Sequence, residues 1–238
     1  IVGGTPQYLL QMNDRLSIEE NIKNTFLNPN SAIFEEPSSL LKQEVREPSI
    51  YNAIITAVAT GASRMAEISA KVGEDTSICS VYIKNLITLG IIRKESPYGE
   101  KSSRRTIYSI EDNMFRFWYR FVPENNSIIA RGAVDLAYKR IEPNLPRYMG
   151  YVFEDICTQY LWSLLLHGKS PVDFSEIGRW WGTDWVQSCK NRLHKRLHGK
   201  GRRAGQCRTH HLCRYSKRIA LMSFFRFNST LTARSPHG

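Results

Sequence analysis

The stretch from residue 49 to residue 110 constrains the fold most, because its patterning changes once, from helical to extended. Three segments carry apolar residues at helical spacing, and they occupy residues 49–61, 64–72 and 76–90. Gly61 and Gly90 are typical helix stops, and Thr76 is the expected N-cap of the third segment. Two short runs that a polar loop separates follow, and they are expected to be strands at 91–96 and 105–110. The chain is therefore expected to place three helices against one hairpin.

Three helices followed by a hairpin with a basic loop form the winged-helix arrangement, a variant of the helix-turn-helix. Helical spacing in the third helix predicts a core-facing stripe made of Ile78, Tyr82, Leu86 and Leu89. The opposite face would meet the major groove of DNA, and the loop would reach phosphates. This hypothesis gives the DNA-binding candidates Ser77, Ser80, Lys84, Lys101, Arg104 and Arg105. The alternative is a protein-contact domain in which Lys84 is simply solvated.

Five aromatic residues crowd positions 115–121, with Arg116 and Arg120 between them. Aromatic rings interleaved with arginine are suited to stacking on nucleobases. Phe115, Trp118 and Phe121 also fall at helical spacing, which favours the docking of a helix onto the preceding domain. We therefore predict that these rings pack in a core.

The N-terminal part of the chain is also patterned as helix. Ser17 and Glu20 have the spacing of a capping box at the start of 17–26, and a short helix is expected at 38–45. The opening Ile-Val-Gly-Gly is typical of an activated chymotrypsin-like protease, which needs an early histidine base and a later serine. The first histidine is His167 and no Gly-Asp-Ser-Gly-Gly occurs, so this class is excluded.

Composition excludes membrane and secreted classes. No run approaches the roughly 20 apolar residues that span a bilayer, so no membrane partner is expected. The first residues lack the charged region and apolar core of a signal peptide. Five cysteines without a regular framework indicate a reducing, cytoplasmic location.

The net charge of +11 comes entirely from the C-terminal tail, residues 185–238. This tail holds 13 of the 33 Lys and Arg residues and no acid, so the preceding body is slightly acidic. The tail lacks helical and strand periodicity, which predicts disorder and suggests a frameshift in the source gene, with a true basic arm for RNA or DNA as the alternative. Its Cys and His residues lack the paired spacing of a zinc site, so no metal is expected.

The order of several motifs resembles the C-terminal half of archaeal-type ATPases, which are AAA-related signal-transducing ATPases. These motifs are GGTPQYL, EPSIYNAIITAVATGASRMAEISAKVGEDTS, YIKNLITLGIIRKESP and DNMFRFWYRFV, and the resemblance covers about 2–184. It implies four parts: the end of an ATPase module (1–47), a winged helix with the aromatic helix (48–122), the start of a domain of unknown function (123–184) and the tail (185–238). Its implied partners are DNA and the missing ATPase domain.

The chain departs from this family in lacking Gly-x-x-x-x-Gly-Lys-Ser/Thr and the acidic Walker B strand. ATP and Mg²⁺ would therefore belong to the longer parent, and we expect no cofactor and no ATPase activity in this chain. The Gly3–Gly4 pair is expected to form a tight turn into a helix, since glycine tolerates positive φ.

The segment 141–184 resembles the entry to a restriction-endonuclease-like fold. The implied fold class is mainly α with a winged helix, followed by an incomplete α/β domain. In such a fold Glu154 would lie near a metal held by later acidic strands, but no acid follows Asp184 and Ser188 stands where a carboxylate is needed. Glu154 is thus a weak catalytic candidate, and a solvated helix acid is the favoured interpretation. A strand is expected near Arg179, and without its sheet the helix 151–166 should leave these side chains partly exposed: Phe153, Ile156, Tyr160 and Trp162.

Three functions follow. The chain is expected to act as a DNA-binding or regulatory module of an ATPase. The alternatives are a truncated nuclease-like effector and a winged helix that serves as a protein-interaction arm.

Overall fold

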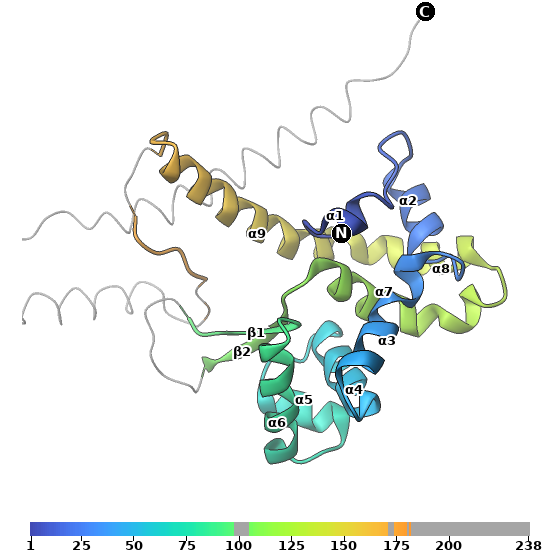
Figure 1. Cartoon of the computed structure of the whole chain (residues 1–238), viewed down its shortest axis with the longest axis horizontal. Helices are drawn as coiled ribbons and strands as arrows, with labels where there is room; N and C mark the ends of the chain where they lie inside the picture. Colours follow the sequence, from blue (N-terminus) through green and yellow to red (C-terminus); the bar gives the residue numbers. More distant parts are fainter. Residues whose placement is uncertain (98–104, 171–173, 180, 182–238) are drawn as a thin grey trace, which may run out of the picture. The chain divides into compact units, whose positions relative to one another are not determined.

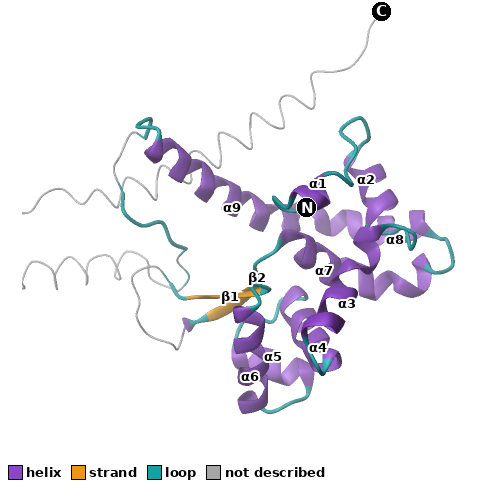
Figure 2. Cartoon of the chain, viewed as in Figure 1, coloured by secondary structure: helices purple, strands orange, loops and turns teal. Residues whose placement is uncertain are grey.

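The computed structural model describes residues 1–97, 105–170, 174–179 and 181. It is mainly helical, with one two-stranded antiparallel sheet (Figure 1). The chain divides into two compact units, Ile1–Val152 and Phe153–Gly238. Figure 2 shows how completely helices dominate the first unit.

The helices lie close to the segments expected from sequence, with two additions. Their bounds are α1 Pro6–Leu9, α2 Ile18–Thr25, α3 Ala32–Glu44, α4 Pro48–Ala59, α5 Met65–Val72, α6 Thr76–Thr88, α7 Asn113–Ile129, α8 Val134–Ile141 and α9 Leu145–Leu166, with a 3₁₀ turn at Glu142–Asn144. The strands are β1 Ile92–Glu95 and β2 Ile107–Ile110. Helix α1 follows the expected turn at Gly3–Gly4, in which Gly3 has φ +70°, whereas α8 and the first turns of α9 were not expected. Helix α3 begins at Ala32 rather than at residue 38. Helix α7 runs without a break across the expected boundary between 122 and 123.

Sequence signals at helix ends are mostly confirmed. Ser17 caps α2, and the Glu20 carboxylate accepts the Ser17 backbone N–H at 2.8 Å, which completes the capping box. Gly90 has φ +72° just after α6, and the next N–H, of Ile91, donates to the Leu86 carbonyl at 2.9 Å. The expected cap at Thr76 is wrong by one residue. Asp75 occupies the cap with extended backbone, and Thr76 is the first helical residue.

Glu67 holds the start of α5 through two backbone bonds. Its carboxylate accepts the N–H of Ser63 at 2.8 Å and of Arg64 at 3.1 Å, and these bonds hold the pKa of Glu67 below its usual range. Because folding lowers this pKa, the ionised carboxylate stabilises the helix start at pH values above the pKa in the unfolded chain, about 4.3. The stabilisation is lost as the pH falls through the pKa in the folded chain. We expect the protection factors of the Ser63 and Arg64 amides, which compare measured with intrinsic exchange rates, to fall below about pH 4. Replacing Glu67 with Gln should remove most of this pH dependence, whereas unchanged protection from pH 7 to pH 3 would contradict the bond.

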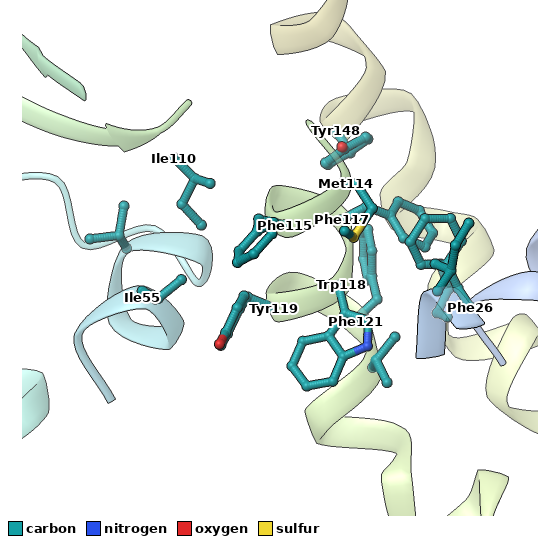
Figure 3. Close-up of a cluster of buried hydrophobic side chains, with 14 of the residues drawn as sticks. Phe26, Ile55, Ile110, Met114, Phe115, Phe117, Trp118, Tyr119, Phe121 and Tyr148 are labelled. Atoms are coloured by element: carbon teal, nitrogen blue, oxygen red, sulfur yellow. The ribbon is translucent and has the colours of Figure 1, made fainter. Parts of the chain in front are cut away.

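The core of the first unit is built around α7 (Figure 3). The rings of Phe26, Phe121 and Tyr148 surround Phe117, with centroids 4.5, 4.9 and 5.4 Å from its own. The Trp118 indole N–H donates to the buried Phe34 carbonyl at 2.8 Å. Tyr119 donates its hydroxyl to Asn52 Oδ1 at 2.6 Å.

All five aromatic side chains at 115–121 are at most 9% exposed. Their flat faces are covered by other side chains, so they are not available to stack on bases. The predicted core packing is confirmed, and base stacking by this segment is excluded.

Helices α4, α5 and α6 pack on one another, α4 and α6 also pack on the hairpin, and α4 packs against α7. The strands pair with Ile92 opposite Ile110 and Glu95 opposite Ile107. The Tyr108 N–H donates to the Ser63 carbonyl at 2.7 Å, which ties the α4–α5 connection to β2. Residues 48–110, called the central segment below, thus contain the expected three helices and hairpin in the expected order.

In the second unit the described residues form the end of α9 and an irregular segment. The Trp162 ring packs edge-on to Phe174 with centroids 5.1 Å apart. Ile156 and Tyr160 are exposed while Phe153 and Trp162 are half-buried, which confirms the expected partial exposure. Neither Arg179 nor Trp181 lies in a strand, so the expected strand is absent from the described positions there.

The predictions for 185–238, including the zinc and frameshift hypotheses, lie outside the described residues. None of the described helices combines the length and the apolar character that crossing a bilayer requires.

Candidate interaction surface

Helix α6 packs on the core through Cys79, Ile83 and Leu86. The predicted stripe is therefore correct at Leu86 and at Tyr82, which is half-buried against the core. It is wrong at Ile78 and Leu89, each of which is 39% exposed. The reason is that apolar residues occupy nearly every side of this helix, so two stripes one residue apart satisfy the helical period. Packing against α4, α5 and β1 selects the stripe that contains the small Cys79.

The DNA-binding candidates are distributed unevenly. Ser77 and Lys84 are exposed on α6, whereas Ser80 is half-buried beside the core stripe. Arg105 is exposed just before β2. Lys101 and Arg104 lie outside the described residues, so the exposure of only part of the predicted set is known.

The solvent face of α6 is more apolar than the sequence prediction implied. Val81 is 58% exposed, and it lies one turn from both Ile78 and Lys84. We define the α6 face as Ile78, Val81, Lys84 and Leu89. It carries one cation and three apolar side chains, and the exposed polar residues Ser77, Asn85 and Thr88 lie among them.

The N-terminal end of α6 is acidic. Glu74 and Asp75 are both exposed immediately before the first helical turn. Carboxylates at this end are favoured by the partial positive charge of the helix N-terminus. They also repel phosphates, because affinity for DNA is dominated by cations that neutralise the backbone.

Polar contacts fix the orientation of α6. The Tyr82 hydroxyl donates to the Glu47 carboxylate, a bond that raises the pKa of Tyr82 to about 12. The Asn85 amide donates to the Tyr51 hydroxyl at 2.8 Å, and the rings of Tyr51 and Tyr82 meet edge-on at 4.8 Å. These contacts connect α6 to α4 and to Glu47, the residue directly before α4. They therefore hold the α6 face toward solvent.

The part of the chain that the structure describes contains no cluster of metal-ligating side chains. Within it, no three His, Cys, Asp or Glu side chains gather closely enough to hold a metal. The Cys79 thiol is buried, and desolvation raises its pKa, which makes it a poor nucleophile. Glu154 is exposed, with Arg179 Nη2 3.0 Å from its carboxylate oxygen, as expected for a solvated helix acid rather than a metal ligand.

Sequence reasoning missed two features of the first unit. Val81 was not singled out, although it interrupts an otherwise polar run of Ser77, Lys84 and Thr88 at helical spacing. The other feature is a small hollow lined by Arg120 and Arg140. Arg120 was noted only for its aromatic neighbours, and no sequence signal connects it to Arg140.

Comparison with known proteins supports a domain of unknown function. Residues 118–193 match the DUF234 family, described as archaeal and bacterial proteins of unknown function. The chain is 32% identical, over 179 residues, to an uncharacterized protein of Methanocaldococcus jannaschii. The aligned part is 75% of this chain and 40% of that relative. No solved structure matches the chain.

These similarities confirm one implication of the sequence resemblance. A domain of unknown function was expected after the hairpin, and the matched residues 118–193 lie there. The chain spans about two fifths of the length of the curated relative it matches. The descriptions of this family and of this relative name neither an ATPase nor DNA, so both remain proposals.

Proposed function

We propose that the central segment is a winged helix that acts as a protein-contact, regulatory module of a longer polypeptide. The order α4, α5, α6, β1, β2 supports the winged-helix assignment. The backbone hydrogen bond from the Tyr108 N–H to the Ser63 carbonyl also supports this assignment. Through this bond the α4–α5 connection pairs with the edge of strand β2 that faces away from β1.

The α6 face carries this proposal. Isolated exposed apolar side chains are ordinary at protein surfaces. Here Ile78, Val81 and Leu89 lie on the one helix that a winged helix presents to its partner, and the cation that accompanies them is Lys84. An apolar centre with polar neighbours is the composition of a protein interface, whereas a DNA-reading helix is rich in Arg, Lys, Asn and Gln.

The proposed occupant of the α6 face is the part of the longer polypeptide that this chain does not cover. The relative is much longer than the aligned part, and the sequence resemblance assigns an ATPase module to the remainder. ATP and Mg²⁺ would bind in that module, because residues 1–238 contain no phosphate-binding loop. The acids Glu74 and Asp75 call for a partner surface with a basic rim beside an apolar centre.

DNA binding is the second candidate function, and exposed Ser77 and Lys84 are the observation that favours it. In that case the double variant with Lys84→Ala and Arg105→Ala would bind a DNA duplex more weakly, and its binding would depend less on salt concentration. A nuclease-like function has less support, because Glu154 is paired with Arg179 at the surface.

Replacing Val81 with Glu should separate the two candidates. The experiment titrates this chain with the missing segment of its own longer polypeptide, produced separately, and then with a DNA duplex. Val81→Glu should weaken protein binding about tenfold or more, since it buries an unpaired charge at the interface. Its effect on stability should stay within about 0.5 kcal/mol, because the position is exposed.

Ala70→Glu is the matched control, since Ala70 is exposed on α5 outside the α6 face. It should bind like the parent chain. Equal protein binding by Val81→Glu and the parent, together with a loss of duplex binding in Lys84→Ala, would reject the protein-contact function in favour of DNA.

A further inference from the structure

A small polar hollow of about 160 Å³ lies between α7 and the α8–3₁₀ segment. Its lining residues are Arg120, Phe121, Glu124, Asn125, Arg140 and Asn144. All of them fall within 118–193, the part that matches the family of unknown function. The hollow shares no residue with the α6 face.

Two arginines with no carboxylate partner among the described residues line this hollow. Arg120 is half-buried, and its guanidinium carbon lies 5.9 Å from the centroid of the Phe121 ring. Arg140 is exposed on α8. Guanidinium groups donate pairs of N–H bonds with the geometry that phosphate oxygens accept.

Two asparagines add neutral donors. Asn125 is only 5% exposed, and its Nδ2 donates to the Phe121 carbonyl at 2.8 Å. Asn144 Nδ2 donates to the Arg140 carbonyl at 3.2 Å. Each amide nitrogen carries two N–H groups, so these internal bonds leave one N–H of each available to a ligand.

We propose that this hollow binds a phosphate group, either as the free ion or as the terminal group of a small phosphate ester. The volume is below the roughly 300–1,000 Å³ of a pocket that encloses a whole organic ligand. It therefore accommodates the phosphate, while the rest of an ester extends into solvent. The Glu124 carboxylate on the lining opposes a dianion and keeps affinity modest.

The test titrates the full chain with inorganic phosphate, glycerol 3-phosphate and acetate, with affinity measured by calorimetry and by ³¹P line broadening. Arg140→Gln should weaken binding of both phosphates by about tenfold or more, because it removes a charge-assisted pair of bonds. Arg120→Gln should do the same, and Glu124→Gln should strengthen binding severalfold. A higher affinity for glycerol 3-phosphate than for inorganic phosphate would identify an ester as the ligand. Equal affinities for the two would identify the free ion.

Arg131→Gln is the matched control, because Arg131 is an exposed arginine just after α7 that does not line the hollow. It removes the same charge and retains the basic tail, so it reports on non-specific attraction. Thermal denaturation confirms that each variant folds, and Arg140 and Glu124 are exposed enough to be replaced without loss of the core. The proposal is overturned if phosphate binding does not saturate, if Arg131→Gln weakens it as much as Arg140→Gln, or if acetate binds as tightly as phosphate.

Discussion

Replacing Phe117 with Ala is expected to destabilise the first unit by about 3–5 kcal/mol, the cost of deleting a large buried ring. Phe117 is fully buried and lies at the junction of α2, α7 and α9, where Phe26, Phe121 and Tyr148 pack on it. The surrounding rings come from the end of α2, from α7 and from α9, so they cannot collapse together into the cavity without moving backbone. Urea unfolding followed by circular dichroism measures this loss.

Leu136→Ala is the matched control for Phe117→Ala. Leu136 lies on α8 in the same unit and is 48% exposed, so its truncation should cost less than about 1 kcal/mol. If Phe117→Ala unfolds at the same urea concentration as Leu136→Ala, then α7 does not organise the core.

The second large effect is expected on α6, where Ile83→Ala should cost about 2–5 kcal/mol. Ile83 is 1% exposed and packs against the core, whereas Ile78 on the same helix is 39% exposed. Ile78→Ala should therefore cost less than about 1 kcal/mol, since most of its apolar area is already in water.

This pair of variants tests the orientation of α6 directly. Both replacements remove the same atoms from the same helix, so helix propensity cancels between them. The stripe expected from sequence places Ile78 in the core, and it predicts the reverse order of stability. Finding Ile78→Ala to be the more destabilised variant would mean that α6 is rotated and that Val81 does not lie at the centre of its solvent face.

The local elements were predictable because their signals are local. A capping box needs only Ser17 and Glu20, and a Schellman-type stop needs only the freedom of Gly90 to adopt positive φ. Helix α3 was predicted to begin at residue 38, directly after Pro37, a residue type that normally breaks helices. In the structure Pro37 is buried with Phe34 and Leu41, and this packing outweighs the single hydrogen bond that proline removes.

The candidate site was less predictable, because it depends on contacts between distant residues. The face of α6 is decided by what packs against Cys79 and Ile83, and several apolar stripes on this helix fit the period equally well. The phosphate hollow joins Arg120 to Arg140 through the packing of α7 on α8, a helix that the sequence did not reveal. Only the aromatic segment gave a correct long-range expectation, since so many large rings in one helix have to be buried.

The most direct measurement of the proposed function places a photo-crosslinking residue, p-benzoylphenylalanine, at position 81 in the longer polypeptide, with DNA present. Mass spectrometry then identifies what lies against the α6 face, and the same crosslinker at position 70 reports on background. A protein-contact module predicts crosslinks from position 81 to the part of the polypeptide outside residues 1–238, and few from position 70. Crosslinks from position 81 to DNA, or equal crosslinking from the two positions, would contradict it.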